Sequence, residues 1–160
     1  MVTPTIANMS KVPPYSRFKP ASETSSRIKR SVRSTETKAE RTLVRALKAK
    51  GLAFETHCAD LPGKPDIVFR TALLAVFCDG DFWHGRHWPS LQTRLRGRAN
   101  PEYWVAKIAA NRSRDRRVAR TLRADGWSVV RVWETDVLKD PEGAVRAVVR
   151  HLRRRQSADS

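Results

Sequence analysis

The sequence predicts an α/β fold in which helices flank a mixed central sheet. Two apolar runs, Ile67–Phe69 and Ala72–Cys78, lie between turn residues and have the length and composition of buried strands joined as a hairpin. Amphipathic segments over residues 37–50 and 101–124 predict helices on either side, and Trp127–Trp133 predicts a further strand. With 160 residues, 40% of them hydrophobic, the chain is long enough for one domain with a core.

Local signals set the limits of the helices. Thr37-x-x-Glu40 is a capping-box pattern, and Gly51 predicts the end of the first helix. Asn100 followed by Pro101 predicts the start of the long helix, with Asn100 as its cap. The remaining expectations are a flanking strand over residues 52–58, a polar loop over residues 86–100, and a final helix from residue 141 that buries Val145, Val148, Val149 and Leu152.

The two ends of the chain differ from the middle in composition. Residues 1–24 are rich in Pro, Ser, Thr and Lys and predict a disordered arm. Residues 25–152 form the single predicted domain, and residues 153–160 a basic C-terminal tail that frays. Arg30 lies in a basic stretch that either binds phosphates or stays a solvated segment.

The charge of the chain favours a nucleic-acid partner. Its formal net charge is +16 and its pI about 11.1, so a polyanion is the simplest partner, although a solvated, ribosomal or membrane-surface role stays open. Cys58 and Cys78 lack metal-ligand spacing, which argues against a disulfide framework and a thiolate zinc site and fits a reducing cytoplasm. No run of about 18 apolar residues predicts a membrane span.

Acids, aromatics and a histidine gather at one predicted edge of the sheet. Asp66 precedes one strand of the hairpin and Asp79 follows the other, so both carboxylates can share a hard divalent cation. Phe82, Trp83 and His84 come directly afterwards. Aromatic rings stack on or wedge between bases, and histidine transfers protons near neutral pH. This combination suits hydrolysis of a phosphodiester bond.

The two long helical segments carry polar residues on their buried stripes. Glu40 either completes the capping box or turns its carboxylate towards the acids of the sheet. Asn111 and Asp115 interrupt the apolar stripe of the long helix, and a buried carboxylate needs a partner, either an arginine or an imidazole. Arg94 in the polar loop and Arg112 and Arg116 on the helix are expected to contact DNA phosphates, unless they belong to an ordinary solvated surface.

Several ordered motifs resemble the very short patch repair (Vsr-type) DNA mismatch endonucleases. They are L-P-G-K-P-D at residues 61–66, G-D-F-W-H at 80–84, T-K-x-E at 37–40, N-x-x-R-D-R-R at 111–117 and G-W-x-V at 126–129. The likeness covers residues 27–138. It implies the PD-(D/E)xK restriction-endonuclease-like fold, with Pro65-Asp66 at the position that gives this class its name.

The resemblance also implies roles for single residues. Asp66 and the backbone carbonyl of Cys78 would bind Mg²⁺, His84 would act on the attacking water, and Asp115 would orient His84. Glu40 matches the auxiliary glutamate of the site. Phe82, Trp83 and Trp104 match aromatics that family members insert beside a mismatch, although the helical stripe equally places Trp104 in the core.

Two positions depart from the family pattern. Asp79 stands where the best-known members have a histidine, so it either binds the metal directly or has another catalytic role. The positions of their structural zinc ligands fall at Asp81, Arg86, Trp88 and Thr135, which are not a zinc set. We therefore expect no structural zinc, with the local loop held by packing of Trp88 and an Asp81–Arg86 ion pair.

The resulting functional prediction is a Mg²⁺-dependent endonuclease that nicks duplex DNA at T:G mismatches left by deamination of 5-methylcytosine. A restriction or defence nuclease of the same fold and a non-catalytic DNA-binding module are the alternatives. The expected partners are double-stranded DNA and a repair protein, with no membrane. We expect a monomer in the bacterial cytoplasm, associated with the nucleoid.

Overall fold

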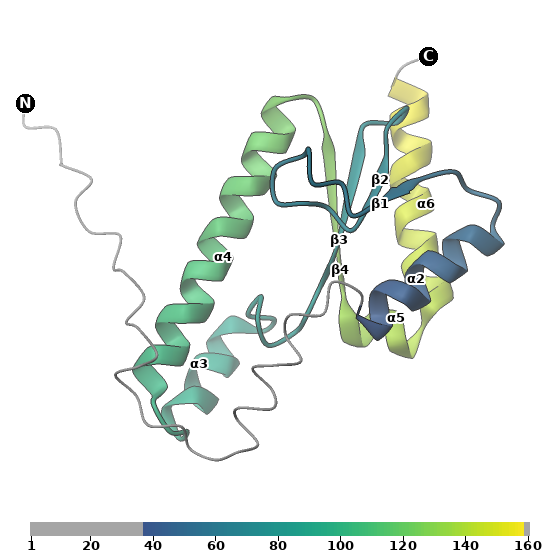
Figure 1. Ribbon diagram of the computed structural model, residues 1–160. Helices are drawn as coiled ribbons and strands as arrows, with labels where there is room; N and C mark the ends of the chain where they lie inside the picture. Colours follow the sequence, from purple (N-terminus) through teal and green to yellow (C-terminus); the bar gives the residue numbers. More distant parts are fainter. Residues whose placement is uncertain (1–36, 159–160) are drawn as a thin grey trace, which may run out of the picture.

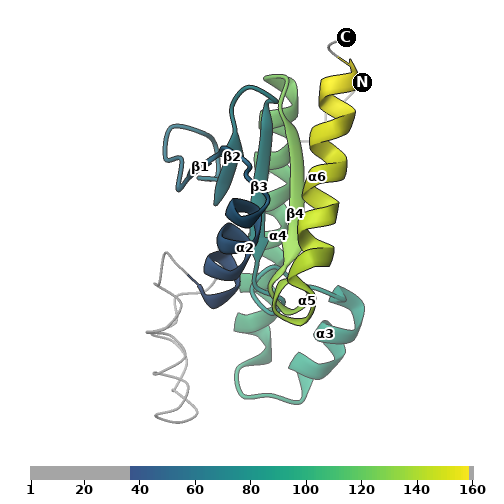
Figure 2. The ribbon, with the colours of Figure 1, turned by 90° about the vertical axis from the view of Figure 1, so that its right-hand side faces the viewer.

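A four-stranded mixed sheet lies between two helical layers in the computed structural model, which describes residues 37–158 (Figures 1 and 2). The elements are α2 (Lys38–Ala49), β1 (Glu55–Thr56), β2 (Ile67–Phe69), β3 (Leu74–Asp79), α3 (Trp88–Arg96), α4 (Pro101–Ala124), β4 (Ser128–Trp133), α5 (Glu134–Lys139) and α6 (Pro141–Ala158). The strand order is β1-β2-β3-β4, with antiparallel pairs except for the parallel pair β3–β4. The predicted fold class and hairpin are confirmed.

Alternation along the strands gives the sheet two different faces. Leu74 and Val76 of β3 belong to the larger core, which α2, α5 and α6 cover. Ala75 and Phe77 point to the other face, where Leu122 of α4 completes a second buried cluster. Figure 1 shows α4 and α6 on opposite sides of the sheet. Because Asp79 has the same parity as Phe77, it follows that the side chain of Asp79 lies on the α4 face.

The segment predicted as a loop over residues 86–100 contains helix α3, so that prediction was wrong. Leu91 and Leu95, one helical turn apart, are buried against Ile108 of α4. Two leucines form too sparse a stripe to show periodicity among polar residues, and Pro89 in the first turn also favours a helix. Asn100 begins α4 as expected, but at φ 57° and without capping through its side chain.

The C-terminal helix is longer than the sequence suggested. α6 runs to Ala158, so fraying from residue 153 is contradicted for residues 153–158. Arg155 holds this part in place, because its Nε donates to the carbonyl of Ala72 at 3.0 Å and its Nη2 to that of Gly126 at 3.1 Å. Val149, predicted as buried, is half-buried and packs against the edge of the core. Ala144, which was not predicted, is buried in the core.

Two further elements differ from expectation. The flanking strand predicted over residues 52–58 contracts to β1, which has two exposed residues at the edge of the sheet. Helix α5 was not predicted, and it buries Val137 in the larger core. The predicted arm, residues 1–24, and Arg30 lie outside the described residues. Within residues 37–158, no helix is long and apolar enough to cross a membrane.

Two neighbouring leucines test the assignment of the larger core. Leu74 is fully buried, whereas Leu73 is 37% exposed. Leu74→Ala is expected to lower the free energy of unfolding by about 2–5 kcal/mol through lost burial and a residual cavity. Leu73→Ala should change it by less than about 1 kcal/mol. Urea unfolding of both variants measures this, and equal losses would contradict the core described here.

Candidate active site

Asp66 lies directly before β2, at the end of the sheet where the predicted acids meet. Its Oδ2 accepts the backbone N–H of Cys78 at 2.7 Å, which joins the two strands of the hairpin. Burial raises the pKa of Asp66, and the nearby carboxylate of Asp79 adds to this rise against the opposing hydrogen bond from Cys78. Burial also raises the pKa of the Cys78 thiol, so Cys78 offers no thiolate to this site.

Glu40 and His57 lie beside Asp66. One ligand atom from each of these three residues can be chosen so that all three lie within 4.8 Å of one another. Glu40 lies in the first turn of α2, where its backbone N–H donates to Thr37 Oγ1 at 3.1 Å. The predicted capping contact therefore forms while the carboxylate of Glu40 lies close to that of Asp66. His57 was not predicted as part of the site, because it fell within the flanking strand predicted over residues 52–58.

His84 and Asp115 form a close pair. Nδ1 of His84 lies 2.6 Å from Oδ2 of Asp115, which α4 brings up from 31 residues further along the chain. Burial alone would raise the pKa of Asp115, but the hydrogen bond from His84 and the charges of His84 and Arg131 outweigh it, and the pKa falls below its usual value. The expectation that Asp115 finds an imidazole or an arginine as its partner is confirmed.

Asp79 is bound by Arg131, a residue that the sequence reasoning missed. Nη1 of Arg131 lies 2.9 Å from Oδ1 and 2.8 Å from Oδ2 of Asp79, whose residue surface is only 4% exposed. His84 Nδ1 is 3.7 Å from Asp79, and Arg131 Nη2 is 3.7 Å from Asp115. Arg131 therefore supplies the positive charge between two carboxylates.

The pairing of β3 with β4 explains how Arg131 reaches this position. Phe77 is in register with Arg131, so both have the parity of the α4 face. The guanidinium lies 4.4 Å from the centre of the Phe77 ring and extends from there to Asp79. A cation within an otherwise apolar strand was the signal available in the sequence, since such a charge needs an acid opposite it.

The aromatic residues form one cluster beside the acids. The ring centres of Phe82, Trp83 and Trp104 are 5.2 to 5.7 Å apart, and all three residues are half-buried. Asn111 donates to the backbone carbonyl of Trp83 at 2.9 Å and so ties the cluster to α4. Trp104 packs against the cluster of Leu91, Leu95 and Ile108 and also contacts the other two rings, as its helical stripe predicted. Its insertion beside a mismatch stays a prediction.

The loop after β3 is held by charges, as the sequence predicted. Arg86 pairs with Asp81 at 3.3 Å and also with Asp136 of α5 at 2.9 Å, while Asp81 accepts the backbone N–H of Thr135 at 3.2 Å. Trp88 packs against the cluster of Leu91, Leu95 and Ile108 and lies 5.2 Å below the guanidinium of Arg112. These contacts join the loop after β3 to α5 and α4.

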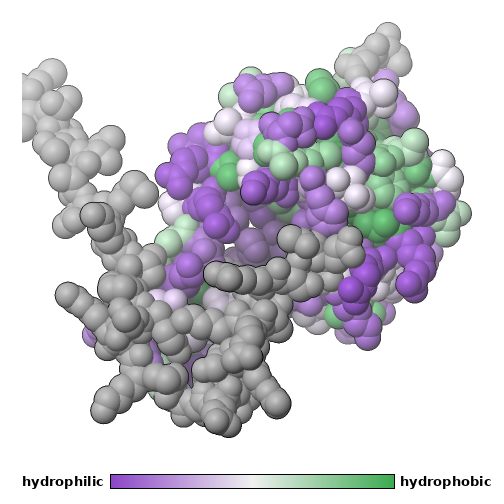
Figure 3. All heavy atoms as spheres, viewed as in Figure 1, coloured by the Kyte–Doolittle hydropathy of each residue, from purple (hydrophilic) through white to green (hydrophobic). Residues whose placement is uncertain are grey.

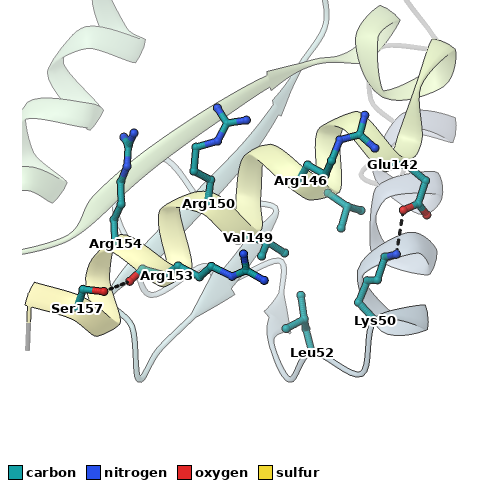
Figure 4. Close-up of a pocket in the computed structure, with 10 residues that line it drawn as sticks. Lys50, Leu52, Glu142, Arg146, Val149, Arg150, Arg153, Arg154 and Ser157 are labelled. Atoms are coloured by element: carbon teal, nitrogen blue, oxygen red, sulfur yellow. Dashed lines mark hydrogen bonds and ion pairs between the residues drawn. The ribbon is translucent and has the colours of Figure 1, made fainter. Parts of the chain in front are cut away.

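A cavity of about 830 Å³ connects these groups. Its lining includes Glu40, Asp66, Asp79, His84 and Asp115, so α2, the hairpin and α4 all contribute to it. The groove in Figure 4 lies elsewhere, over the outer face of α6. The lining of this groove contains one acid, Glu142, which pairs with Lys50 at 3.0 Å. Of these two hollows, the clustered carboxylates therefore lie in the cavity of about 830 Å³.

The arginines predicted to bind phosphates line two hollows other than this cavity. Arg112 and Arg116 line a groove between α4 and β4 that also contains His84 and Asp115. Arg94 is in the last turn of α3, beside Phe82 in a smaller hollow. Hydrophilic side chains cover much of the described surface on the side shown in Figure 3. The acidic cavity is therefore flanked by cations that suit a phosphate backbone.

Comparison with known proteins agrees with this geometry. A sequence model of the family described as DNA mismatch endonuclease Vsr matches residues 18–90. A type II nicking enzyme of Neisseria meningitidis serogroup C is 38% identical over 124 residues, 78% of this chain and 82% of the relative. One of Haemophilus parainfluenzae is 36% identical over 115 residues, 72% and 80% of the two chains. DNA mismatch endonuclease Vsr of Escherichia coli strain K12 is 36% identical over 111 residues, 69% of each chain.

The sheet, its flanking helices and the acids at its end define a nuclease of the restriction-endonuclease-like α/β class. With relatives this similar over most of their length, the chain belongs to the Vsr family and is a DNA endonuclease. Its acidic groups can hold a divalent metal ion, and such ions are generally used by nucleases of this kind.

The raised pKa of Asp66 predicts that this residue lowers the stability of the metal-free protein. The folded state binds the proton of Asp66 more tightly than the unfolded state, so stability is lost as the pH rises through this range. Asp66→Asn should therefore raise the Tm in metal-free buffer at pH 7, by about 2–4 °C for each kcal/mol of stability gained in a domain of this size.

The gain should disappear below the unfolded-state pKa of an aspartate, where wild-type Asp66 is protonated in both states. Asp125→Asn, at an exposed position after α4, is the matched control and should leave the Tm unchanged at both pH values. Thermal unfolding followed by circular dichroism measures the difference, and a lower Tm for Asp66→Asn at pH 7 would contradict it.

Proposed function

We propose that this endonuclease nicks one strand of duplex DNA at a T:G mispair, with Mg²⁺ as its metal ion. The observation that supports this most directly is the His84–Asp115 pair at 2.6 Å, in the same cavity as Asp66 and beside an aromatic cluster. The pair suits activation of a water molecule, and the rings suit recognition of a weakened base step. The nicking named for the N. meningitidis and H. parainfluenzae relatives fits cleavage of one strand.

The roles of the residues follow from their contacts. Because the pKa of Asp115 is lowered, Asp115 is ionised at neutral pH and accepts a hydrogen bond from Nδ1–H of His84. This leaves Nε2 of His84 as the proton acceptor for the attacking water. Asp79 and Arg131 hold the pair in place from the β3–β4 side. We assign Asp79 a positioning role with Arg131 in preference to metal binding, since both of its oxygens already accept from the guanidinium.

The metal site contains Asp66, with Glu40 beside it and the backbone carbonyl of Cys78 as a further proposed ligand. Mg²⁺ held by these residues would offset the negative charge that develops on the phosphate group. Asp66 is suited to this position because its carboxylate is half-buried and has no arginine or lysine within ion-pair distance among the described residues.

The aromatic cluster is proposed to select the mispair. Opening a base step costs a few kcal/mol and costs least at a mismatch, so Phe82 and Trp83 can enter a T:G step more readily than a matched one. Trp104 supports both rings from α4. We further propose that the protein acts as a monomer on double-stranded DNA in the bacterial cytoplasm near the nucleoid, with a repair protein as partner and without structural zinc.

A nicking assay tests the proposed reaction. Duplexes that differ only in a T:G or C:G pair are incubated with the protein and Mg²⁺, and we expect a single-strand nick beside T:G at a rate at least tenfold above that at C:G. Asp66→Asn should reduce nicking by 10³-fold or more while mismatch binding is retained, and Asp125→Asn should behave as wild type.

The alternatives predict other results. A restriction nuclease of this fold would cleave both strands of a matched duplex. A DNA-binding module without turnover would show the same trace of nicking in wild type and Asp66→Asn.

The arginine-lined groove predicts how DNA affinity depends on salt. Arg116 and Arg120 both line the groove that contains His84, whereas Arg150 and Arg154 lie on α6, on the opposite side of the sheet. Replacing Arg116 and Arg120 with alanine should reduce the slope of log K against log salt concentration by about two, since each lost phosphate contact removes roughly 0.9. The Arg150→Ala, Arg154→Ala double variant is the matched control, and a similar loss there would place DNA on α6 instead.

A further inference from the structure

The pairing of β1 with β2 brings His57 beside Asp66. Glu55 is in register with Val68 and Thr56 with Ile67, so the next pair along this ladder is His57 with Asp66. The backbone N–H of His57 donates to the carbonyl of Asp66 at 3.1 Å, which shows that the pairing continues past the end of β1. The backbone of His57 is itself left-handed, with φ 52°, so the ladder ends at this residue. An imidazole nitrogen of His57 nevertheless lies within 4.8 Å of an oxygen of the Asp66 carboxylate.

Glu40 completes a group of three donors. It comes from the first turn of α2, and its carboxylate, the imidazole of His57 and the carboxylate of Asp66 each offer one atom within 4.8 Å of the other two. His57 is exposed, while Glu40 and Asp66 are half-buried, so the group opens to solvent on the histidine side. One metal ion can bind all three side chains only when their donor atoms are this close together.

We propose that His57 is a ligand of the metal ion that binds Asp66, and that this ligand makes the site favour Mn²⁺ or Co²⁺ over Mg²⁺. The inference extends the metal site of the proposed function. Imidazole nitrogen binds transition metals well, whereas Mg²⁺ prefers a shell of oxygen atoms alone. Two carboxylates and one imidazole form a mixed donor set that Mn²⁺ and Co²⁺ accept.

A second group of possible donors, Asp79, His84 and Asp115, is less suited to a cation. Arg131 lies between its two carboxylates, and Nη1 of Arg131 is within 2.9 Å of both oxygens of Asp79. A metal ion there would have to displace the guanidinium or lie next to its positive charge.

Titration of metal-stripped protein with Co²⁺ tests the inference, because Co²⁺ bound through nitrogen and oxygen absorbs visible light. His57→Ala should weaken Co²⁺ binding at least about tenfold, because even loss of a residue that only orients a ligand costs roughly 10–100-fold in metal affinity. Binding of Mg²⁺, measured by competition with Co²⁺, should weaken less. His151→Ala, which removes a histidine of α6 that bonds its own helix, is the control and should bind Co²⁺ as wild type does.

His84→Ala separates the two groups of donors. It should retain the Co²⁺ spectrum of the wild type, and loss of the spectrum in His84→Ala but not in His57→Ala would place the ion beside Asp115 and overturn the inference. Equal Co²⁺ affinities of wild type and His57→Ala would also overturn it. Circular dichroism confirms that each variant is folded before titration.

The metal-binding result can be separated from the nicking result. If His57→Ala loses Co²⁺ affinity while the wild type fails to nick at T:G with any metal, the ligand assignment stands and the proposed reaction fails. If the wild type nicks T:G as proposed and His57→Ala binds Co²⁺ normally, only the ligand assignment fails.

Discussion

The repulsion among Asp66, Asp79 and Asp115 is the constraint that the rest of the site must offset. All three line one cavity at the end of the sheet, together with Glu40 and Glu134, and each of the three is compensated differently. Arg131 binds Asp79, His84 binds Asp115, and Asp66 receives a single backbone N–H from Cys78. The pKa shifts agree with this difference, because the pKa of Asp115 is lowered and the pKa of Asp66 is raised. Asp79 and Asp115 therefore have side-chain partners that offset their negative charge, whereas Asp66 is left with the strongest need for a cation.

The same cavity divides into two halves with different chemistry. On the α4 side, a carboxylate and an arginine fix one imidazole, which is an arrangement for moving a proton. On the α2 side, Glu40 and Asp66 provide carboxylate oxygen atoms within 4.8 Å of each other, which is an arrangement for holding a cation. The sheet keeps these halves apart, because β3 presents Asp79 to one half while the amide of Cys78 binds the acid of the other. A phosphate group that contacts both halves would lie next to the proton-accepting histidine and the cation-binding carboxylates at the same time.

The local sequence was sufficient to predict some features and not others. The hairpin, α2 and α4 were predictable because strong apolar patterns and turn residues mark them, and the motif at residues 61–66 identified Asp66. Helix α3 was missed because Leu91 and Leu95 are its only buried residues and form too sparse a stripe. Arg131 and His57 were missed for a different reason. Their importance arises from strand register, since Arg131 meets Asp79 only through the parallel pairing of β3 with β4, and His57 meets Asp66 only through the antiparallel ladder of β1 with β2. Such pairings join distant parts of the chain and leave no local pattern.

The larger core also affects the order in which the chain can fold during synthesis. Leu43 and Leu47 of α2, among the first described residues, share this core with Val145, Val148 and Leu152 of α6, among the last. While the ribosome is still making α4 and β4, the apolar side of α2 and one face of the sheet have no cover from α6. The catalytic half on the α4 face can assemble earlier, but Glu40 reaches its final position only when α2 is fixed. Closure of the larger core therefore waits for α6, and the nascent chain exposes apolar surface that a chaperone could bind until then.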